Sequence, residues 1–293
     1  MIIVFNPAAN PSAGPLRRTR LWRVLDLLAA SGVRIELHET RHRGHGTEIA
    51  RAAAAAGAPT IVAAGGDGTI AEVAQGLLGS PCRLGVIPLG TANVLAHEFS
   101  LPFAPRAVAA ALGFGRTRPL WAGLARSEAG ERVFVQMIGA GFDAEVVHRV
   151  SPALKRRLGR GAYVLGALRE LPRYRFRPIR LRLDGEEIET GSVVVCKGRL
   201  YGGPYRLAAA ADPSRPGFSV ALFDHAGPWA TLLCGAALPL DLLDRTPFLR
   251  VRRAMRVEIL GPAPTPAQSD GDPSGRLPLA ISDAPAPIAL IVG

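Results

Sequence analysis

The sequence predicts an α/β domain with a parallel sheet over residues 1–122 and a mainly antiparallel β domain over residues 123–293. Apolar strand-length runs alternate with helical patterns through the first 120 residues, the order that produces a parallel sheet covered on both faces. After about Gly123, short apolar runs are separated by glycine and proline turns, which is typical of antiparallel sheets. The chain has 293 residues, enough for two such domains.

Four strand and helix pairs make up the expected first domain. Each strand is a short apolar run, and each helix has an apolar face or is rich in alanine. The strands are expected at residues 2–5, 33–37, 60–64 and 84–87, and the helices at 16–31, 45–57, 70–78 and 92–99. Ligands of such sheets bind beyond the carboxyl ends of the strands, so we expect the turns that follow these strands to converge on one site.

The expected second domain contains many short strands and few helices. Its strands are expected at 133–138, 179–183, 192–196, 218–223, 257–260 and 288–292, and its helices at 144–150, 153–171 and 229–243. Segment 261–275 is rich in Pro, Ser and Gly, a composition that indicates a linker. The last residues of the chain can pack back on the first domain.

The net charge of +11 comes almost entirely from arginine, because lysine occurs only at Lys155 and Lys197. With abundant Ala, Gly and Pro, this composition indicates a bias of the source genome. The chain has no basic motif with interleaved aromatic residues, so we expect no nucleic-acid partner. Basic residues cluster at 155–160, 169–182 and 250–256. Solvated faces and contact with an anionic membrane explain these clusters about equally well, since each basic residue near such a membrane contributes roughly 1 kcal/mol.

The sequence predicts a cytoplasmic protein, with peripheral attachment to the inner face of a membrane as an option. Met1 leads directly into a strand, so no signal peptide is expected. The most apolar later stretch, 229–243, is about 15 residues long, short of the ~20 that a spanning helix needs, and indicates a buried or interfacial helix. Cys82, Cys196 and Cys234 have no disulfide or zinc spacing.

The most informative segment is a glycine loop between an expected strand and an expected helix. Gly65, Gly66 and Gly68 surround one carboxylate, Asp67, directly after the strand at 60–64. Glycines let the backbone approach an anion, and the start of a helix favours negative charge, so this arrangement indicates a phosphate site. Asp67 would repel a bare phosphate, which argues for a bound Mg²⁺ or for a base that takes a proton from a hydroxyl. The alternative is a tight strand-to-helix turn without a ligand.

Several other chemistries lack their motifs in this chain. There is no G-x-x-x-x-G-K-[ST] loop, no G-x-G-x-x-G helix start, no G-x-S-x-G elbow and no H-E-x-x-H pair. His38 and His42 have a spacing of four residues but fall where a strand is expected to end, so we do not expect a metal there.

Motifs along nearly the whole chain resemble the diacylglycerol kinase catalytic domain superfamily, which includes bacterial soluble lipid kinases, sphingosine kinases and ceramide kinases. The first is Gly65-Gly66-Asp67-Gly68-Thr69 with Glu72, similar to the element G-G-D-G-T-x-x-E. That element alone is shared with NAD kinases, but its combination with the later motifs is specific to the lipid kinases. The other matching segments are Asn6-Pro7 with Gly14, Glu39-Thr40, Gly44-His45, and residues 88–96, 140–143, 198–203 and 270–272.

The resemblance implies an NAD kinase/diacylglycerol kinase-like fold with a nucleotide cleft between the two domains, and ATP and Mg²⁺ as cofactors. The residues that it assigns to the nucleotide are Asn6, Pro7, Thr40, His45, Gly65, Gly66, Gly68, Thr69, Glu72, Gly90, Thr91 and Asn93. Alternatives stay open for four of them. Asn6 can contact the glycine loop and Glu72 the loop backbone, while Thr91 can cap a helix and His45 can be a surface residue.

The resemblance also places Asp270 on a turn of the second domain that faces the nucleotide. We favour Asp270 as the base for the lipid hydroxyl and Asp67 as the organiser of Mg²⁺-ATP, although the sequence leaves the choice of base open. The candidate metal ligands are Asp67, Asp272 and Asp212.

Some positions depart from the family pattern. Ala210 and Ser219 stand where the family often has carboxylates, and Lys197 replaces a familiar Asn. We therefore expect a structural metal site in this region to be weakened or absent.

The predicted function is an ATP-dependent lipid kinase that acts on a membrane lipid, with diacylglycerol as the first choice and ceramide or a sphingoid base as the second. A non-catalytic nucleotide-binding regulator with a degenerate kinase site is the main alternative, and an NAD kinase is the third. The expected partners are the lipid substrate and an anionic membrane surface, and a homodimer stays open.

Overall fold

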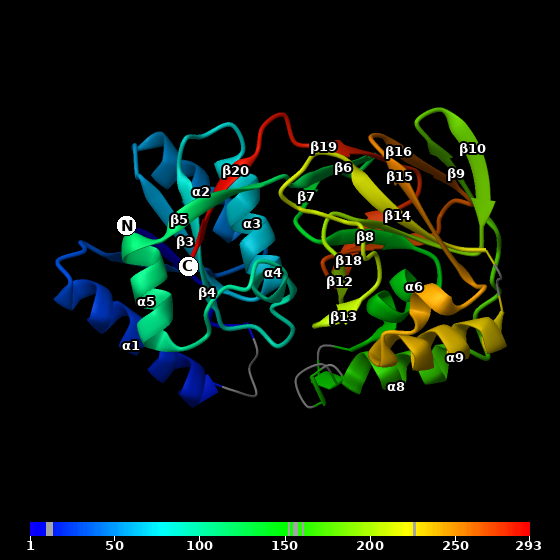
Figure 1. Cartoon of the computed structure of the whole chain (residues 1–293), viewed down its shortest axis with the longest axis horizontal. Helices are drawn as coiled ribbons and strands as arrows, with labels where there is room; N and C mark the ends of the chain where they lie inside the picture. The colour runs from blue at the N-terminus through cyan, green and yellow to red at the C-terminus, as the bar shows by residue number, and fades with distance from the viewer. Residues whose placement is uncertain (10–13, 152, 155–157, 160, 225–226) are drawn as a thin grey trace. The chain divides into compact units, whose positions relative to one another are not determined.

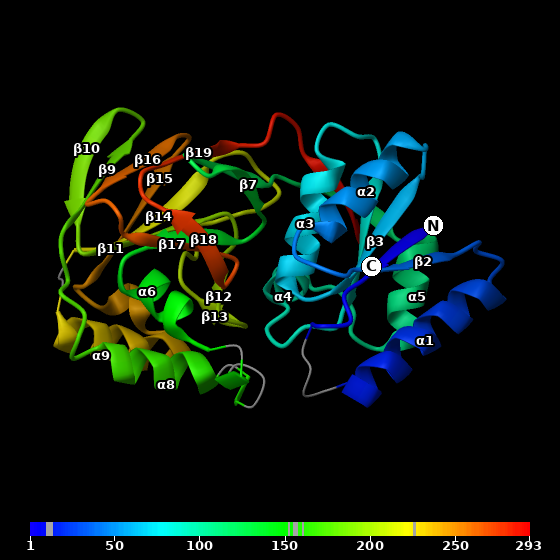
Figure 2. The same cartoon turned by 180° about the vertical axis from the view of Figure 1, so that it is seen from behind.

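The computed structural model describes residues 1–9, 14–151, 153–154, 158–159, 161–224 and 227–293. The chain divides into two compact units, drawn in Figures 1 and 2. The first unit comprises Met1–Ala122 together with Ala284–Gly293, and the second comprises Gly123–Asp283. The chain therefore passes from one unit to the other twice.

The first unit is built on a six-stranded sheet with the order β2-β1-β3-β4-β20-β5. The first five strands are parallel to their neighbours, and β5 runs antiparallel to β20. The strands are β1 Ile2–Phe5, β2 Glu36–Glu39, β3 Thr60–Gly65, β4 Arg83–Pro88, β5 Arg116–Leu120 and β20 Ile288–Val292. The final strand of the chain thus lies inside the first sheet.

Helices cover both faces of this sheet. Helices α1 and α5 pack on one face, and α2 and α3 lie on the other (Figure 1). Every residue of β3 is buried, as expected for a central strand whose alternating side chains enter two hydrophobic layers. The helices are α1 Gly14–Ala30, α2 His45–Ala55, α3 Asp67–Leu77, α4 Val94–Glu98 and α5 Pro105–Phe114.

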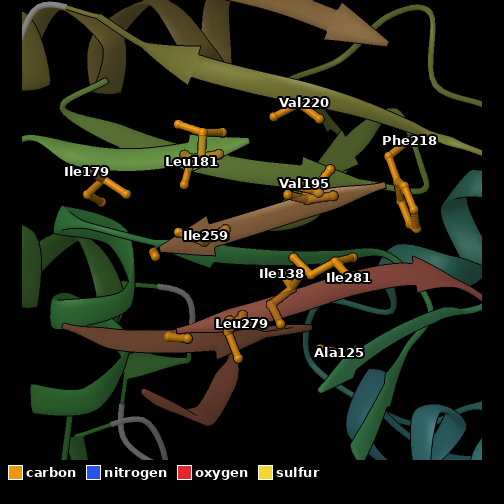
Figure 3. Packing of buried hydrophobic residues seen from close by; sticks show 14 of the residues in the cluster. Ala125, Ile138, Ile179, Leu181, Val195, Phe218, Val220, Ile259, Leu279 and Ile281 are labelled. Carbon is orange, nitrogen blue, oxygen red and sulfur yellow. The ribbon is translucent and has the colours of Figure 1, made fainter. Parts of the chain in front are cut away.

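The second unit is a sandwich of two six-stranded antiparallel sheets. One sheet has the order β10-β9-β16-β19-β6-β7, and the other β15-β14-β11-β8-β17-β18. Inward side chains of both sheets form one core, in which Leu181 and Ile259 from the first meet Val195 and Val220 from the second (Figure 3). The strands are β6 Gly123–Ser127, β7 Gly130–Phe134, β8 Met137–Ala140, β9 Ile179–Leu183, β10 Glu186–Thr190, β11 Ser192–Cys196, β14 Phe218–Phe223, β15 Leu249–Ala254, β16 Val257–Gly261, β17 Pro266–Ser269, β18 Asp272–Arg276 and β19 Leu279–Asp283.

A small hairpin and several helices complete the second unit. The hairpin consists of β12 Leu200–Tyr201 and β13 Tyr205–Arg206. The α-helices are α6 Phe142–Arg149, α8 Gly161–Glu170 and α9 Pro228–Ala237, and two 3₁₀ turns follow, Leu238–Leu240 and Leu243–Arg245. Among the described residues, no helix combines the length and the apolar character that crossing a bilayer requires.

The predicted fold class, a parallel α/β unit and an antiparallel β unit, is confirmed. Local boundaries differ. The second strand is β2 at Glu36–Glu39 and not 33–37, and the expected strand 133–138 is divided between β7 and β8. Of the expected helix 153–171, residues 155–157 and 160 lie outside the described residues, and α8 covers its second half.

Two further predictions from the sequence were wrong. The helix after the glycine loop begins at Asp67 and not at residue 70, because Gly66 serves as the N-cap and an acidic residue in the first turn is favourable. Segment 261–275 is not a linker, since β17 and β18 form a hairpin there with Asp270 at its turn. Asp270 and Gly271, both with positive φ, form the tight turn of this hairpin.

Candidate functional site

The turns that follow β1, β3 and β4 lie at the carboxyl edge of the parallel sheet, as the alternation of strands and helices requires. Asn6 and Pro7 follow β1, Gly66 follows β3, and Gly90 comes two residues after β4. Thr40 follows β2, and its N–H donates to the carbonyl of Phe5 at 2.8 Å. The structure therefore brings together Asn6 and Gly90, which are 84 residues apart in the sequence.

The glycine loop is held from the β1 side by an amide. Asn6 Nδ2 donates to Thr69 Oγ1 at 3.1 Å, and Asn6 Oδ1 accepts the N–H of Ala8 at 2.9 Å. Thr69 also fills the space beside Gly65, where a Cβ atom would lie 2.3 Å from Thr69 Oγ1. The loop thus closes on itself over a side chain in the first turn of α3.

A second glycine loop packs directly on the first. Leu89 N–H donates to Gly65 O at 2.9 Å, and a Cβ atom added to Gly90 would lie 2.5 Å from Gly66 Cα. Asn93, which has φ 47°, closes this loop with two bonds to Gly90, from Gly90 N to Oδ1 at 2.8 Å and from Nδ2 to Gly90 O at 2.9 Å. Only glycine allows the two backbones to approach so closely.

Asp67 connects the two loops. It occupies the first turn of α3, and its Oδ1 accepts the N–H of Leu95 in α4 at 3.1 Å. The carboxylate thus joins the first turn of α3 to the helix that follows the second loop. A carboxylate beside glycine loops and a helix start is suited to a phosphate that is bound together with a divalent cation. Thr91 lies in the second loop between Gly90 and Asn93.

Glu72 supports the start of α2. Its Oε1 accepts the N–H of Gly44 at 2.8 Å, and its Oε2 accepts that of Gly46 at 3.0 Å. Its own carbonyl accepts the Thr47 hydroxyl at 2.9 Å. Both carboxylate oxygens of Glu72 thus hold the backbone around His45 at the beginning of α2.

The histidines near this helix are arranged differently from the spacing that the sequence suggested. His38 on β2 pairs with Glu36, with 2.7 Å between His38 Nε2 and Glu36 Oε1. His42 instead stacks on His45, with ring centroids 4.8 Å apart. The ligand atoms of His42, His45 and Glu48 lie within 4.8 Å of one another, but His45 Nδ1 accepts the N–H of Arg41 at 3.1 Å. That bond leaves the proton of neutral His45 on Nε2, which opposes metal binding by this ring.

In the second unit, Asp270 anchors the junction between β7 and β8. Its carboxylate accepts three backbone N–H groups, from Val135, Gln136 and Met137, each at 2.9 Å. Asp270 has φ 49°, and its own N–H donates to Met137 O at 2.9 Å. These bonds explain why β7 and β8 are two strands, because residues 135 and 136 turn to meet the carboxylate. The strand β18 starts with Asp272 immediately after this turn.

A polar cluster below the Asp270 turn was not anticipated from the sequence. Asp143, in the first turn of α6, accepts hydrogen bonds from Tyr201 Oη and from Gln268 Nε2. Gln268 Oε1 in turn accepts the N–H of Gly271 at 3.0 Å. Burial raises the pKa of the Asp143 carboxyl, and burial together with Asp143 raises the pKa of the Tyr201 hydroxyl well above its usual value. The only sequence signal was that Asp143 and Tyr201 lie in matching motifs.

The residues near Asp212 do not fit a structural metal site. Asp212 Oδ1 accepts the N–H of Ser214 at 2.9 Å, and Oδ2 lies 3.4 Å from Arg215 Nε. Ala210 offers no side-chain ligand, and Ser219 is buried within β14. Besides Arg215, the ammonium of Lys197 lies near this loop and contacts its carbonyl oxygens.

Comparisons with known proteins identify the family. Residues 1–124 match the model described as diacylglycerol kinase catalytic domain, and residues 136–292 match the YegS C-terminal NAD kinase beta sandwich-like domain. The chain belongs to the diacylglycerol kinase family of lipid kinases. It is therefore a kinase, and the family implies that it uses ATP and acts on a lipid.

Individual relatives agree with this membership in the family of lipid kinases. The chain is 30% identical to a diacylglycerol kinase of Mycobacterium tuberculosis, covering 96% of this chain and 98% of the relative. It is 31% identical to a probable lipid kinase YegS-like of Pseudomonas aeruginosa, covering 78% of each. A crystal structure of a diacylglycerol kinase from Bacillus anthracis has the same fold, with a TM-score of 0.72 at 17% identity over 100% of this chain and 96% of that chain.

Proposed function

We propose that this lipid kinase transfers the γ-phosphoryl group of ATP, with Mg²⁺, to the free hydroxyl of diacylglycerol. The observation that supports it most is the pair of glycine loops in backbone contact at Gly66 and Gly90, with the Asp67 carboxylate between them. A relative that matches almost the full chain carries the name diacylglycerol kinase, which favours this acceptor. Ceramide or a sphingoid base is the second candidate.

The two loops have the chemistry that phosphoryl transfer needs. The N–H groups of a helix start and of glycine loops bind phosphate oxygens and cost no reorganisation during the reaction. The nucleotide side of the proposed site comprises Asn6, Pro7, Thr40, His45, Gly65, Gly66, Gly68, Thr69, Gly90, Thr91 and Asn93, with Glu72 supporting the His45 backbone. When bound, Mg²⁺ neutralises charge on the transferring phosphoryl group, and Asp67 is the proposed ligand, with Asp272 as a second candidate.

Asp270 is proposed as the residue that takes the proton of the lipid hydroxyl. Three backbone N–H bonds hold its carboxylate in one orientation, and a general base must lie within hydrogen-bond reach of the proton that it takes. The same bonds give Asp270 a structural role, so its variant must be judged by turnover and by stability together.

The proposal is tested with labelled ATP and detergent micelles that contain diacylglycerol, ceramide or sphingosine. Wild type with Mg²⁺ should label diacylglycerol preferentially, and Asp67→Asn should abolish labelling. Asp26→Asn, which changes an exposed carboxylate on α1, is the matched control and should retain full activity. Absence of labelling in every lipid class would refute the proposal. ATP binding without turnover would favour the regulatory alternative, and formation of NADP from NAD would favour an NAD kinase.

The same proposal includes contact with the membrane that contains the substrate, and helix α9 is the surface that supports it. None of its residues is buried, although Cys234, Ala237 and Leu238 on and just after it pack against the core. The opposite side exposes Trp229 by 79% and Leu233 by 52%. The stretch 227–240 has no charged residue, and an exposed apolar helix with a tryptophan is typical of an interfacial helix.

Part of the arginine cluster at 250–256 is paired with carboxylates. Arg250 pairs with Asp224 and Arg252 with Glu186, which cancels part of their charge. Residues 155–157 and 160 of the cluster at 155–160 lie outside the described residues. We therefore assign the main contact to the apolar side of α9.

Sedimentation with lipid vesicles tests the membrane contact. The double variant Trp229→Ala/Leu233→Ala should bind vesicles at least about tenfold more weakly, because each large side chain contributes roughly 1.5–3 kcal/mol when buried. Phe114→Ala is the matched control, since Phe114 is 83% exposed on α5 of the first unit. Equal vesicle binding by the double variant and wild type would contradict this assignment.

A further inference from the structure

Lys197 is a buried lysine in the second unit, directly after β11. Its side chain has no exposed surface, which is rare because an ammonium loses its hydration when it is buried. Its Nζ donates to Asp283 Oδ1 at 2.6 Å, to Gly217 O at 3.0 Å and to Arg215 O at 3.2 Å. The charge also lies 4.9 Å from the ring centroid of Phe218.

The three oxygen atoms around this ammonium come from two separate segments. Arg215 and Gly217 belong to the loop that precedes β14, and Asp283 is the last residue of β19. Asp283 also binds the loop directly, because its Oδ2 accepts the N–H of Gly217. A cluster of two carbonyl oxygens and one carboxylate is the ligand type that hard cations prefer.

The remaining bonds show that this loop is organised around the ammonium. Asp212 closes a turn onto Ser214 N–H and lies near Arg215, so its carboxylate is engaged within the loop. Burial lowers the pKa of Lys197, while Asp283 and Asp212 oppose that effect. Burial of an ammonium costs free energy. Removing the ammonium would nevertheless be unfavourable, because its carboxylate partner would then have no compensating charge.

We infer that Lys197 is a built-in cation, whose ammonium fills the oxygen cage formed by Arg215, Gly217 and Asp283 and holds the loop before β14 to the end of β19. The second unit therefore needs no bound metal ion in this region. This accounts for the lysine at position 197, because its ammonium supplies the positive charge that the oxygen atoms of Arg215, Gly217 and Asp283 surround. The inference concerns the stability of the second unit and does not depend on the proposed acceptor.

The experiment is a thermal melt of Lys197→Ala in chloride salts of equal ionic strength, without nucleotide. This variant leaves Asp283, whose side chain is only 12% exposed, without its cation, and its melting temperature should fall by about 10 °C. Ammonium or Ca²⁺ can enter the vacated cage and should restore several degrees of that loss, whereas a bulky tetraalkylammonium should restore none. Wild type should not respond to either small cation, because its cage is filled.

Two further variants keep the test decisive. Lys197→Ala/Asp283→Asn lacks the anionic ligand and should show no recovery with either cation. Lys197→Met fills the space of the lysine side chain with an apolar side chain of similar length. It also leaves Asp283 without its cation, so it should melt below wild type, but it should not respond to added cations. If Lys197→Ala is too unstable to purify, wild type and Lys197→Met carry the test. Stabilisation of wild type by Ca²⁺ that Asp212→Asn removes would overturn the inference, as would a Lys197→Ala melt that cations leave unchanged.

Because the readout is a melting temperature, this experiment separates the inference from the proposed function. A chain that phosphorylates no lipid can still show cation rescue of Lys197→Ala. An active lipid kinase without cation rescue would contradict only the built-in cation.

Discussion

Replacing Gly90 by alanine tests whether the contact between the two glycine loops is needed for phosphoryl transfer. The added Cβ would lie 2.5 Å from Gly66 Cα and 2.8 Å from Asn93 Oδ1. Carbon atoms in contact are about 3.5 Å apart or more, so the loops must separate by about 1 Å. Both neighbouring atoms belong to tightly bonded loop structure, and no flexible side chain can absorb the shift.

A displacement of this size in a catalytic site costs about 100-fold in rate, or ~2.7 kcal/mol of transition-state stabilisation. We therefore expect the kcat/KM of Gly90→Ala for ATP to fall by about 100-fold. Steady-state kinetics with diacylglycerol micelles would measure it, and a thermal melt would show that the variant is folded.

Gly113→Ala is the matched control for this prediction. Gly113 lies in helix α5 of the same unit, and a Cβ atom there would meet nothing within 4 Å. The control should keep full activity and gain slightly in stability, because alanine favours a helix over glycine by about 1 kcal/mol. A folded Gly90→Ala variant with activity within about threefold of wild type would show that the contact between the loops has no part in catalysis, against the reasoning from their geometry.

Three other substitutions give outcomes that can be measured by thermal melts. Glu72→Gln should cost about 1–3 kcal/mol, because an amide offers only one oxygen to the N–H groups of Gly44 and Gly46; an unchanged melting temperature would oppose this role. Asp270→Asn should lower the free energy of unfolding by about 2–4 kcal/mol, because an amide offers one oxygen to the three backbone N–H groups that the carboxylate accepts. A variant that is as stable as wild type but inactive would show that Asp270 acts in catalysis alone. Asp143→Asn tests a pH dependence. Burial raises the pKa of Asp143, so its contribution to stability is fully present below the unfolded pKa near 4 and is lost as pH rises through the folded pKa. The variant should lack this decline, and an identical pH profile of the melting temperature in both proteins would disprove the assignment.

The first half of the fold could be predicted because its signals are local. An apolar run, a glycine loop and a helix follow one another at Thr60–Leu77, and the order of strands and helices fixes the edge at which the loops meet. The sequence placed the start of α3 three residues too late, because glycine has a low helix propensity. In the structure the helix begins at Asp67, directly after its N-cap Gly66.

The second half depends on contacts between residues far apart in the sequence. Asp143 bonds to Tyr201 and Gln268, which follow it by 58 and 125 residues, and no local pattern reports such a pairing. The oxygen cage of Lys197 likewise needs Asp283, which is 86 residues away. From the sequence, Lys197 was notable only as a departure from the family pattern. The contacts of its ammonium with backbone carbonyl oxygens are visible only in the folded structure.

The position of β20 has a consequence for how the chain is synthesised. This strand lies between β4 and β5, yet it leaves the ribosome more than 160 residues after β5 does. Until then, two strands of a nascent first unit have no common neighbour, and their unpaired N–H and C=O groups can recruit other chains. The sheet of the first unit is completed only after the entire β sandwich has been translated. The N-terminal unit should therefore need protection by chaperones for longer than the second unit.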